Sequence, residues 1–383
     1  MDFSLTSEQQ MFRQMFRDFA ARDVAKAADQ ADKQEELPAR LLKRVAAQGF
    51  MAALAPEEPY GGVGLDAVTY TLLLEALSAE CMSAALTIHV HNSLGLRTIL
   101  RHGSAALQEA LVAEMAAGER IAAFALTEPA AGSDPTCLRT AAVRDGDAYV
   151  LKGEKSWVAN GGLAGVYLVF AQLDSRITAF ALPAETPGLV VGGRQKTLGL
   201  RAAAITRLYL NDCRAPAENL LGAEGQGYKI ALEALDFGRV GLAAVALGVG
   251  RRAVELGVKF AAERVQFGGP IGQKQAIQDY LADAAAEVAA TEWLVRHAAW
   301  LADSGKPFGQ EAAIAKLFAS RMAAQVTNRI VQVHGGYGYI TDYPIERYYR
   351  DARSLEIMEG TTQVQQIVIA GGLFAGTNVR VRP

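Results

Sequence analysis

The sequence predicts an α+β fold with a helical domain at each end and a small antiparallel β domain between them. Three changes of pattern along the 383 residues indicate this order. Helical periodicity runs to about residue 118, short strand-like runs separated by turn residues occupy 119–222, and long alanine-rich helical stretches follow. We therefore expect three domains, at 1–118, 119–222 and 223–383, which suits a chain with 51% hydrophobic residues.

Each segment carries local signals for its elements. Thr6 and Gln9 predict a capping box at the start of the first helix. Apolar residues then fall on one face of that helix: Met11, Phe12, Met15, Phe16 and Phe19. In the middle segment, Arg144-Asp145-Gly146-Asp147 is a hairpin signal. The later helices are expected to break at the turns 267–271 and 304–307.

A glycine pattern in the last segment resembles a dinucleotide fingerprint. Gly248 and Gly250 match the first two glycines of Gly-x-Gly-x-x-Ala, and Ala253 matches its end. The pattern follows the helical run 239–247, whereas the fingerprint requires a preceding strand. We therefore reject a Rossmann site here and expect these small residues to allow close packing of helices.

Composition excludes several classes of protein. The net charge is -3 with no basic run, so we expect neither nucleic-acid binding nor membrane insertion, and no apolar run is long enough to span a bilayer. Cys81, Cys137 and Cys213 lie far apart and form no zinc or disulfide pattern, so we expect no metal. The first residues show no signal or transit peptide pattern. These features predict a cytoplasmic protein with a small-molecule partner.

Near the C-terminus, Glu359 lies between the apolar pair Ile357-Met358 and a Gly-Thr turn. It precedes the periodic stretch 364–373, where a loop leads into a helix and a side chain is able to face a cleft. That position favours a catalytic base. The alternative is an ordinary acid in a first helical turn, stabilised by the helix dipole. This segment alone leaves both interpretations open.

Two loops of the middle segment favour a flat cofactor. Residues 127–134 (TEPAAGSD) offer backbone donors and two hydroxyls that suit the polar edge of a heteroaromatic ring. Residues 155–162 (KSWVANGG) close another strand with the indole of Trp157, against which a flat ring is able to stack. A tryptophan at a strand end more often belongs to the core, so neither loop is decisive alone. Together they indicate a flavin shelf.

Two segments of the last domain favour phosphate or ribose contacts. Arg264 and Phe267 follow a long helix at an exposed bend, where an arginine suits either a pyrophosphate or a surface ion pair. Gly335 and Gly336 leave the backbone bare after another helix, for close approach of a ligand or simply as a helix C-cap. We interpret His334 as structural, since no neighbouring residue in the sequence forms a relay with it.

Taken in order, these segments resemble the acyl-CoA dehydrogenase family, and the resemblance covers the chain from about Leu5 to Phe374. It implies an FAD between the β domain and the C-terminal helices of a homotetramer. It also implies an acyl-CoA thioester as substrate and electron-transferring flavoprotein as electron acceptor. Asp236-Phe237-Gly238-Arg239 and residues 90–94 (VHNSL) are similar to the short-chain, butyryl-type branch.

The resemblance also assigns roles to residues. Glu359 matches the base that removes the α proton. Some members carry the base at the position of Gly238, which cannot serve, so Glu359 is the sole candidate. The implied cofactor residues are Phe124, Leu126, Thr127, Ser133, Trp157, Ala159, Arg264, Phe267, Gln275, Gln332, Gly335, Gly336, Thr361 and Gln363. Of these, residues 332–336 are implied to reach the FAD of a neighbouring subunit. The implied substrate residues are Ser133, Asp236, Arg239 and Gly360.

The chain departs from the family pattern at several positions. Ala159 stands where many members have a hydroxyl beside flavin N5, which keeps an oxygen-using oxidase of the same fold as an alternative. The other departures are Ala202 to Ala204, where serine is common, Met358 in place of an aromatic residue, and Gln366 and Gly371 in place of basic residues. A non-catalytic scaffold paralogue is a further alternative. Retention of Glu359 with the cofactor motifs argues against it.

Overall fold

The computed structural model describes residues 4–377, so residues 1–3 and 378–383 of the first and last expected domains lie outside the described part. The N-terminal segment is helical as expected, and the capping box of Thr6 and Gln9 is present. Its helices are α1 Ser7–Phe19, α2 Ala25–Gln34, α3 Ala39–Ala47, α4 Glu57–Tyr60, α5 Ala67–Glu80, α6 Met82–His89, α7 Arg97–His102 and α8 Ala105–Ala116. Two π-helical stretches, η1 Ala20–Val24 and η3 Val90–Leu96, continue α1 and α6.

The middle segment forms one sheet with the order β6-β7-β3-β2-β4-β5-β8, and β1 pairs with β4 beside this path. Its strands are β1 Ile121–Ala125, β2 Ala141–Asp145, β3 Ala148–Val158, β4 Ala164–Leu173, β5 Arg176–Pro183, β6 Leu189–Arg194, β7 Thr206–Pro216 and β8 Leu220–Leu221. The hairpin predicted at 144–147 joins β2 to β3, with Gly146 at a positive φ of 63°.

Most strand pairs are antiparallel, as expected, but the sheet is mixed. β1 lies parallel to β4 along its whole length, and β2 has one parallel contact with β4. The physical reason is the connection. The chain leaves β1 through a long loop and the β2–β3 hairpin before it enters β4, so β4 runs in the same direction as β1.

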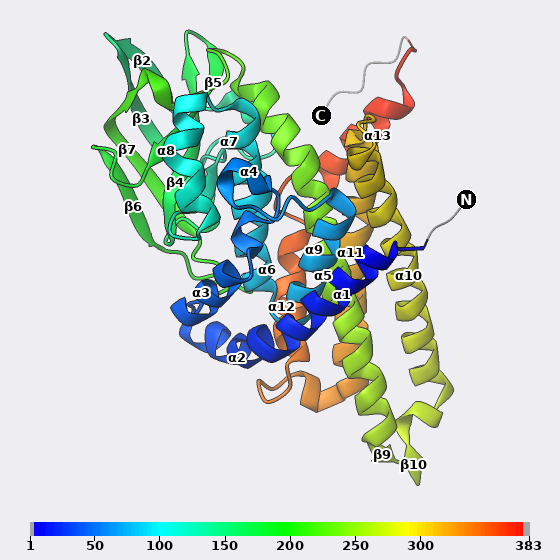
Figure 1. Cartoon of the computed structure of the whole chain (residues 1–383). Coiled ribbons are helices and arrows are strands. Elements are labelled where there is room, and N and C mark those ends of the chain that lie inside the picture. The colour runs from blue at the N-terminus through cyan, green and yellow to red at the C-terminus, as the bar shows by residue number, and fades with distance from the viewer. Residues whose placement is uncertain (1–3, 378–383) are drawn as a thin grey trace.

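The C-terminal segment is a bundle of long helices. They are α9 Gly227–Glu263, α10 Gln275–Asp303, α11 Gly309–His334, α12 Ile345–Leu355 and α13 Thr362–Leu373. A short hairpin of β9 Val265–Gln266 and β10 Gly269–Pro270 separates α9 from α10, and the break before α11 is also where the sequence predicts it. With 37 residues, α9 is about 55 Å long and runs from the β domain to the hairpin (Figure 1).

Close helix packing explains the glycine pattern in α9. A Cβ added to Gly248 would overlap the backbone oxygen of Glu75 and the hydroxyl of Ser78, both on α5. The α5 helix is buried around most of its circumference, so the two backbones meet in the core. Gly248 therefore lies within α9 and lets this helix pack closely against α5. Because no strand precedes the glycine pattern, the rejection of a Rossmann site is confirmed.

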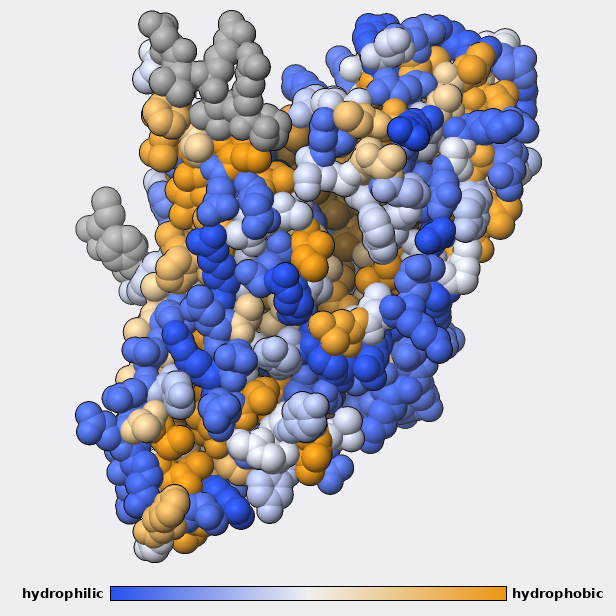
Figure 2. Space-filling model, turned by 180° about the vertical axis from the view of Figure 1, so that it is seen from behind, coloured by the Kyte–Doolittle hydropathy of each residue, from blue (hydrophilic) through white to orange (hydrophobic). Residues whose placement is uncertain are grey.

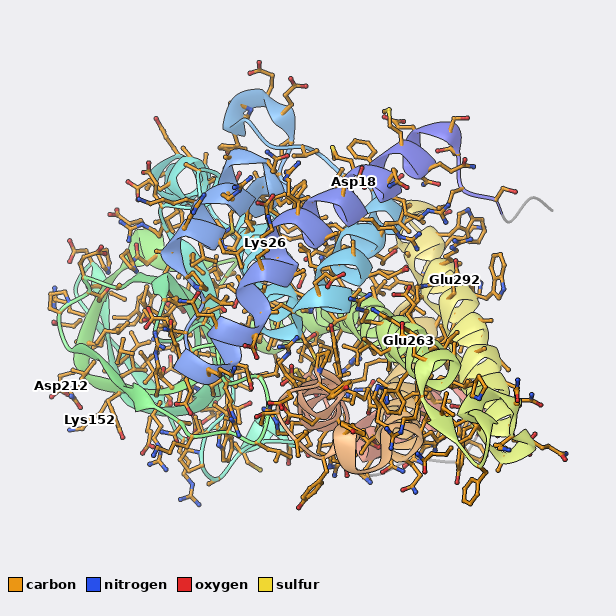
Figure 3. The ribbon with its side chains drawn as sticks, turned by 90° about the horizontal axis from the view of Figure 1, so that it is seen from below. Asp18, Lys26, Lys152, Asp212, Glu263 and Glu292 are labelled. Carbon is orange, nitrogen blue, oxygen red and sulfur yellow. The ribbon has the colours of Figure 1, made fainter. Side chains whose placement is uncertain are left out.

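The β domain and α10 lie on opposite sides of the molecule when it is seen from below (Figure 3). Lys152 on β3 and Asp212 on β7 point outward from the β domain, on the side away from α10, with their charged atoms 3.8 Å apart. Glu292 on α10 lies on the other side.

Among residues 4–377, no helix is long and apolar enough to span a bilayer.

The contact at Gly248 predicts a measurable stability difference. Gly248→Ala is expected to lower the free energy of unfolding by about 1–3 kcal/mol, because the added methyl forces α5 and α9 apart. Gly371→Ala in α13 is the matched control, since no atom lies within 4 Å of its added Cβ and alanine favours a helix by up to about 1 kcal/mol. Thermal unfolding of both variants checks the difference, and equal melting temperatures would contradict the packing role.

Candidate active site

Glu359 lies in a tight turn between α12 and α13. Its φ is 52° and that of Gly360 is 93°, and the side chain of Thr361 caps α13 by accepting a hydrogen bond from Val364. Glu359 therefore precedes the helix and is not an acid of its first turn. Its side chain is only 7% exposed, so the turn directs a carboxylate into the protein. The interpretation as a solvent-facing dipole acid does not fit this position.

The two oxygens of the Glu359 carboxylate have different surroundings. Oε1 lies 3.0 Å from Nε2 of His89, whose side chain is completely buried at the end of α6. Oε2 is buried and has no hydrogen-bond partner among the described residues. It faces Gly238 on α9, where an added Cβ would overlap it. A glycine at 238 therefore leaves the room that this oxygen occupies.

The backbone of the turn is held from two sides. Lys316 on α11 donates from Nζ to the carbonyl of Gly360 at 2.6 Å. Gln365 on α13 donates from Nε2 to the carbonyls of Glu359 and Gly360, at 3.2 and 2.9 Å. Burial lowers the pKa of Lys316 to about 8, although the charge of Glu359 acts in the opposite direction. These contacts fix the direction in which the carboxylate points.

The predicted substrate residues divide between two places. Arg239 is 4% exposed and donates to Oδ1 of Asp236 at 2.7 Å, while its Nε has no partner among the described residues. Burial lowers the pKa of Arg239, and the charges of Asp236 and Glu359 oppose this effect. Asp236, Arg239 and Gly360 thus lie on the elements around Glu359, whereas Ser133 lies on an exposed loop of the β domain.

That loop is anchored by a buried ion pair. Lys155 donates from Nζ to Oε1 of Glu128 at 2.7 Å, and both side chains are at most 4% exposed. The Glu128 carboxylate also accepts the backbone N–H groups of Arg139 and Thr140. Burial acts to raise the pKa of Glu128, but Lys155 and these hydrogen bonds outweigh it and lower the pKa. The pair fixes the loop that begins at Thr127.

The β domain presents surfaces that fit a flat aromatic cofactor. The indole of Trp157 is 62% exposed at the end of β3, where most side chains of that strand end are buried. Gly132 in the anchored loop has no atom within 4 Å of an added Cβ, so its backbone is open to a ligand. From behind, a hollow with hydrophobic walls lies between the β domain and the C-terminal helices (Figure 2). An exposed ring and open backbone donors suit a flavin.

The N-terminal helices join this edge of the sheet to Glu359. Asn160, just after β3, donates from Nδ2 to the carbonyls of Thr87 on α6 and Ala122 on β1, both at 3.0 Å. Two residues further along the same helix, His89 contacts Glu359. Ala159 and Phe124 are half-buried against the same core, and Leu126 is half-buried next to the anchored loop. All three domains therefore meet at the candidate site.

The remaining predicted cofactor residues lie at two other positions. Thr361 and Gln363 are at the start of α13, next to Glu359. Arg264, Phe267, Gln275, Gln332, Gly335 and Gly336 lie at the far end of the bundle. The guanidinium of Arg264 lies 5.1 Å from the ring centre of Tyr337, and Phe267 is 94% exposed at the hairpin. Along α9 this end is about 37 Å from Gly238, so one chain does not bring these residues to Glu359.

His334 belongs to that far end and has a structural environment. Its ring stacks on Phe260 with 4.3 Å between ring centres, and its Nδ1 lies 2.8 Å from the carbonyl of Ile330. No carboxylate or nucleophile contacts it among the interactions of the described residues. This agrees with its interpretation as a structural residue.

Sequence reasoning missed several residues of the site. His89, Lys316 and Gln365 contact the Glu359 turn, and Glu128 pairs with Lys155. The available signal was a polar or charged residue on the apolar face of a periodic helix, as with Lys316 among alanines. That signal marks a buried polar group without naming its partner.

Comparison with known proteins identifies the family. Family models for the acyl-CoA dehydrogenase N-terminal, middle and C-terminal domains match residues 6–119, 123–213 and 225–374. The short-chain specific acyl-CoA dehydrogenase of Mus musculus is 42% identical over 97% of this chain and 91% of its own length.

Two solved structures have the same fold. A chain of the structure described as an electron-transferring flavoprotein of Acidaminococcus fermentans has a TM-score of 0.96 and 42% identity, covering 98% of this chain and all of the other. A glutaryl-CoA dehydrogenase of Mycobacterium smegmatis in complex with FADH2 has a TM-score of 0.94 and 29% identity, covering 98% and 97%. The chain belongs to the acyl-CoA dehydrogenase family, whose members are FAD-dependent oxidoreductases acting on CH–CH groups.

Proposed function

We propose that the chain dehydrogenates a short or branched-chain acyl-CoA thioester to the trans-2-enoyl-CoA, with Glu359 as the base. The observation that carries this proposal is the buried Oε2 of Glu359, which has no partner in the described chain and faces the space left by Gly238. A buried acceptor without a donor is costly unless a ligand supplies one. The α C–H of a bound thioester is the proton source that we assign to it.

The chain's own residues divide the work. Oε2 of Glu359 takes the α proton, while Lys316 and Gln365 keep the turn from swinging away. When bound, FAD supplies the two-electron acceptor for the β hydride. Thr127, Ser133 and Trp157 hold the flavin on the β domain. Positioned base catalysis contributes roughly 10²- to 10⁴-fold.

The thioester carbonyl also needs a donor, because removal of the α proton places negative charge on its oxygen. The backbone N–H of Glu359 makes no hydrogen bond within residues 4–377. We assign it to the carbonyl oxygen. One such donor is worth about 10²- to 10³-fold. Because the carboxylate and this N–H donor belong to the same residue, they fix the position of the α carbon relative to the carboxylate.

A short or branched acyl group suits the residues around Glu359. The relative in Mus musculus is named short-chain specific. Leu94 on η3 closes the space beside Gly238, and Tyr70 stacks on Phe237 with 6.1 Å between ring centres. We propose that these large side chains limit the length of the acyl chain.

The cofactor residues at the far end of the bundle support assembly with another subunit, and we propose the homotetramer that the family resemblance implies. Arg264 and its neighbours lie far from Glu359 within one chain, so they reach a flavin only on another subunit. Exposed aromatic side chains at that end, Phe267 and Tyr339, are 94% and 89% exposed and suit an interface. We assign electron-transferring flavoprotein as the acceptor, on the similarity to the chain of that Acidaminococcus structure.

Glu359→Gln tests the base. The amide keeps the shape and the contact to His89 but cannot take a proton, so substrate-dependent bleaching of the flavin should fall at least 10²-fold. Anaerobic absorbance of the oxidised flavin measures the rate, and the bound FAD and acyl-CoA affinity should stay near those of the parent protein. Bleaching at the parental rate would remove Glu359 from the base role.

A panel of thioesters tests the substrate. Propionyl- to octanoyl-CoA, with branched and aromatic members, should give the fastest anaerobic bleaching with short or branched acyl groups, because large side chains limit the pocket. A long-chain optimum would contradict this. In air, hydrogen peroxide formed without an added acceptor would favour the oxidase that Ala159 keeps as an alternative.

Lys316→Met tests the clamp on the turn. The replacement keeps an unbranched side chain but removes the donor to Gly360, so the bleaching rate should fall about 10-fold while FAD content is unchanged. Lys43→Met, at an exposed position of α3, is the matched control and should keep the parental rate.

The same variant should also change the pH dependence of stability. Because burial lowers the pKa of Lys316 to about 8 from 10.5, the unfolded chain binds more protons than the folded chain between these values. The contribution of Lys316 to the free energy of unfolding therefore rises with pH across this window. Lys316→Met should lack this rise in denaturant titrations. An unchanged pH profile would contradict a lowered pKa of Lys316 in the folded chain.

A further inference from the structure

We propose that His89 is a positioning residue for the catalytic carboxylate, which it holds by donating from Nε2 to Oε1 of Glu359. This inference rests on the proposed role of Glu359 as base. The two atoms are 3.0 Å apart, although the residues are 270 positions apart in the chain. The tether occupies one oxygen and leaves Oε2, the unpartnered oxygen, to take the proton.

The surroundings of His89 hold its ring in one orientation. Its side chain is completely buried, and a Cβ added to Gly241 on α9 would overlap Cε1 of the ring. In addition, Nδ1 lies 3.2 Å from the hydroxyl of Ser93, which donates to the carbonyl of His89 at 2.8 Å. Movement of the ring would break these contacts, so the tether is rigid.

Hydrogen-bond chemistry assigns the tautomer. An ionised carboxylate only accepts, so Nε2 must carry the hydrogen that faces Oε1. In the neutral imidazole Nδ1 is then an acceptor. The single hydroxyl hydrogen of Ser93 is shared between Nδ1, at 3.2 Å, and the carbonyl of His89, at 2.8 Å. When Oε2 takes the α proton, Oε1 still accepts from Nε2. The reaction therefore requires no rearrangement of the network, which keeps the geometry needed for proton transfer.

The matched pair His89→Gln and His89→Met tests the tether. Both replacements are long and unbranched, but only glutamine carries an N–H that is able to reach Oε1. In His89→Met, the rate of anaerobic flavin bleaching by a short acyl-CoA should fall on the order of 10- to 100-fold, with KM little changed. In His89→Gln the rate should stay within a few-fold of the parent. His89→Met should also show a larger isotope effect with α-deuterated substrate.

His91→Met is the control for packing. His91 is equally buried two residues along the chain, and it contacts the carbonyl of Met51 and the N–H of Ala122 but not Glu359. The His91→Met variant should have a lower melting temperature than the parent protein but an unchanged isotope effect. If the two His89 variants bleach at the same rate, whether parental or reduced, the ring only fills space and the proposal is overturned.

The outcome is separable from a failure of the proposed function. Loss of bleaching in Glu359→Gln, together with equal rates in the two His89 variants, would contradict the positioning role of His89 but leave Glu359 as the base. Flavin bleaching at the parental rate in Glu359→Gln would contradict the assignment of Glu359 as the base. FAD content and melting temperature are measured for every variant, so that loss of folding in His89→Met is distinguished from loss of rate. If that variant does not fold, His89→Leu replaces it in the comparison with His89→Gln.

Discussion

The structure depends on burying one carboxylate where three domains meet. An isolated ionised carboxylate inside a protein costs several kcal/mol unless donors and charges compensate it. For Glu359 the compensation comes from the buried ring of His89, the buried ammonium of Lys316 and the guanidinium of Arg239. These groups lie on α6, α11 and α9, so the carboxylate is stabilised only when all three helices are docked.

The long helix α9 organises this docking. At its start, Gly227 packs against the backbone of β5 in the β domain. Further along, Gly238 and Gly241 let the helix approach Glu359 and His89, and Gly248 lets it approach α5. Each close approach requires a residue without a side chain. The C-terminal end of the same helix lies about 37 Å from the site, so the residues near the hairpin lie far from Glu359 within one chain.

Local structure was largely predictable from the residues. The capping box of Thr6, the hairpin at Gly146 and the break after Glu263 were each predicted from signals that span a few neighbouring positions. The parallel pairing of β1 with β4 was not, because strand partners distant in sequence are chosen by packing and connection. The contacts of His89 and Lys316 were missed for the same reason. A polar residue in an apolar helix indicates a buried polar group, but its partner is set by tertiary packing.

By itself, the sequence determined the order of helices, sheet and helices, the family through its ordered motifs, and Glu359 as the candidate base. These properties follow from patterns within a segment, where neighbouring residues decide φ, ψ and periodicity. Only the tertiary structure decided which oxygen of Glu359 is held, which is left unpartnered, and which far residues hold it. The physical reason is that such contacts join residues as much as 270 positions apart, and packing of the whole chain sets their distance.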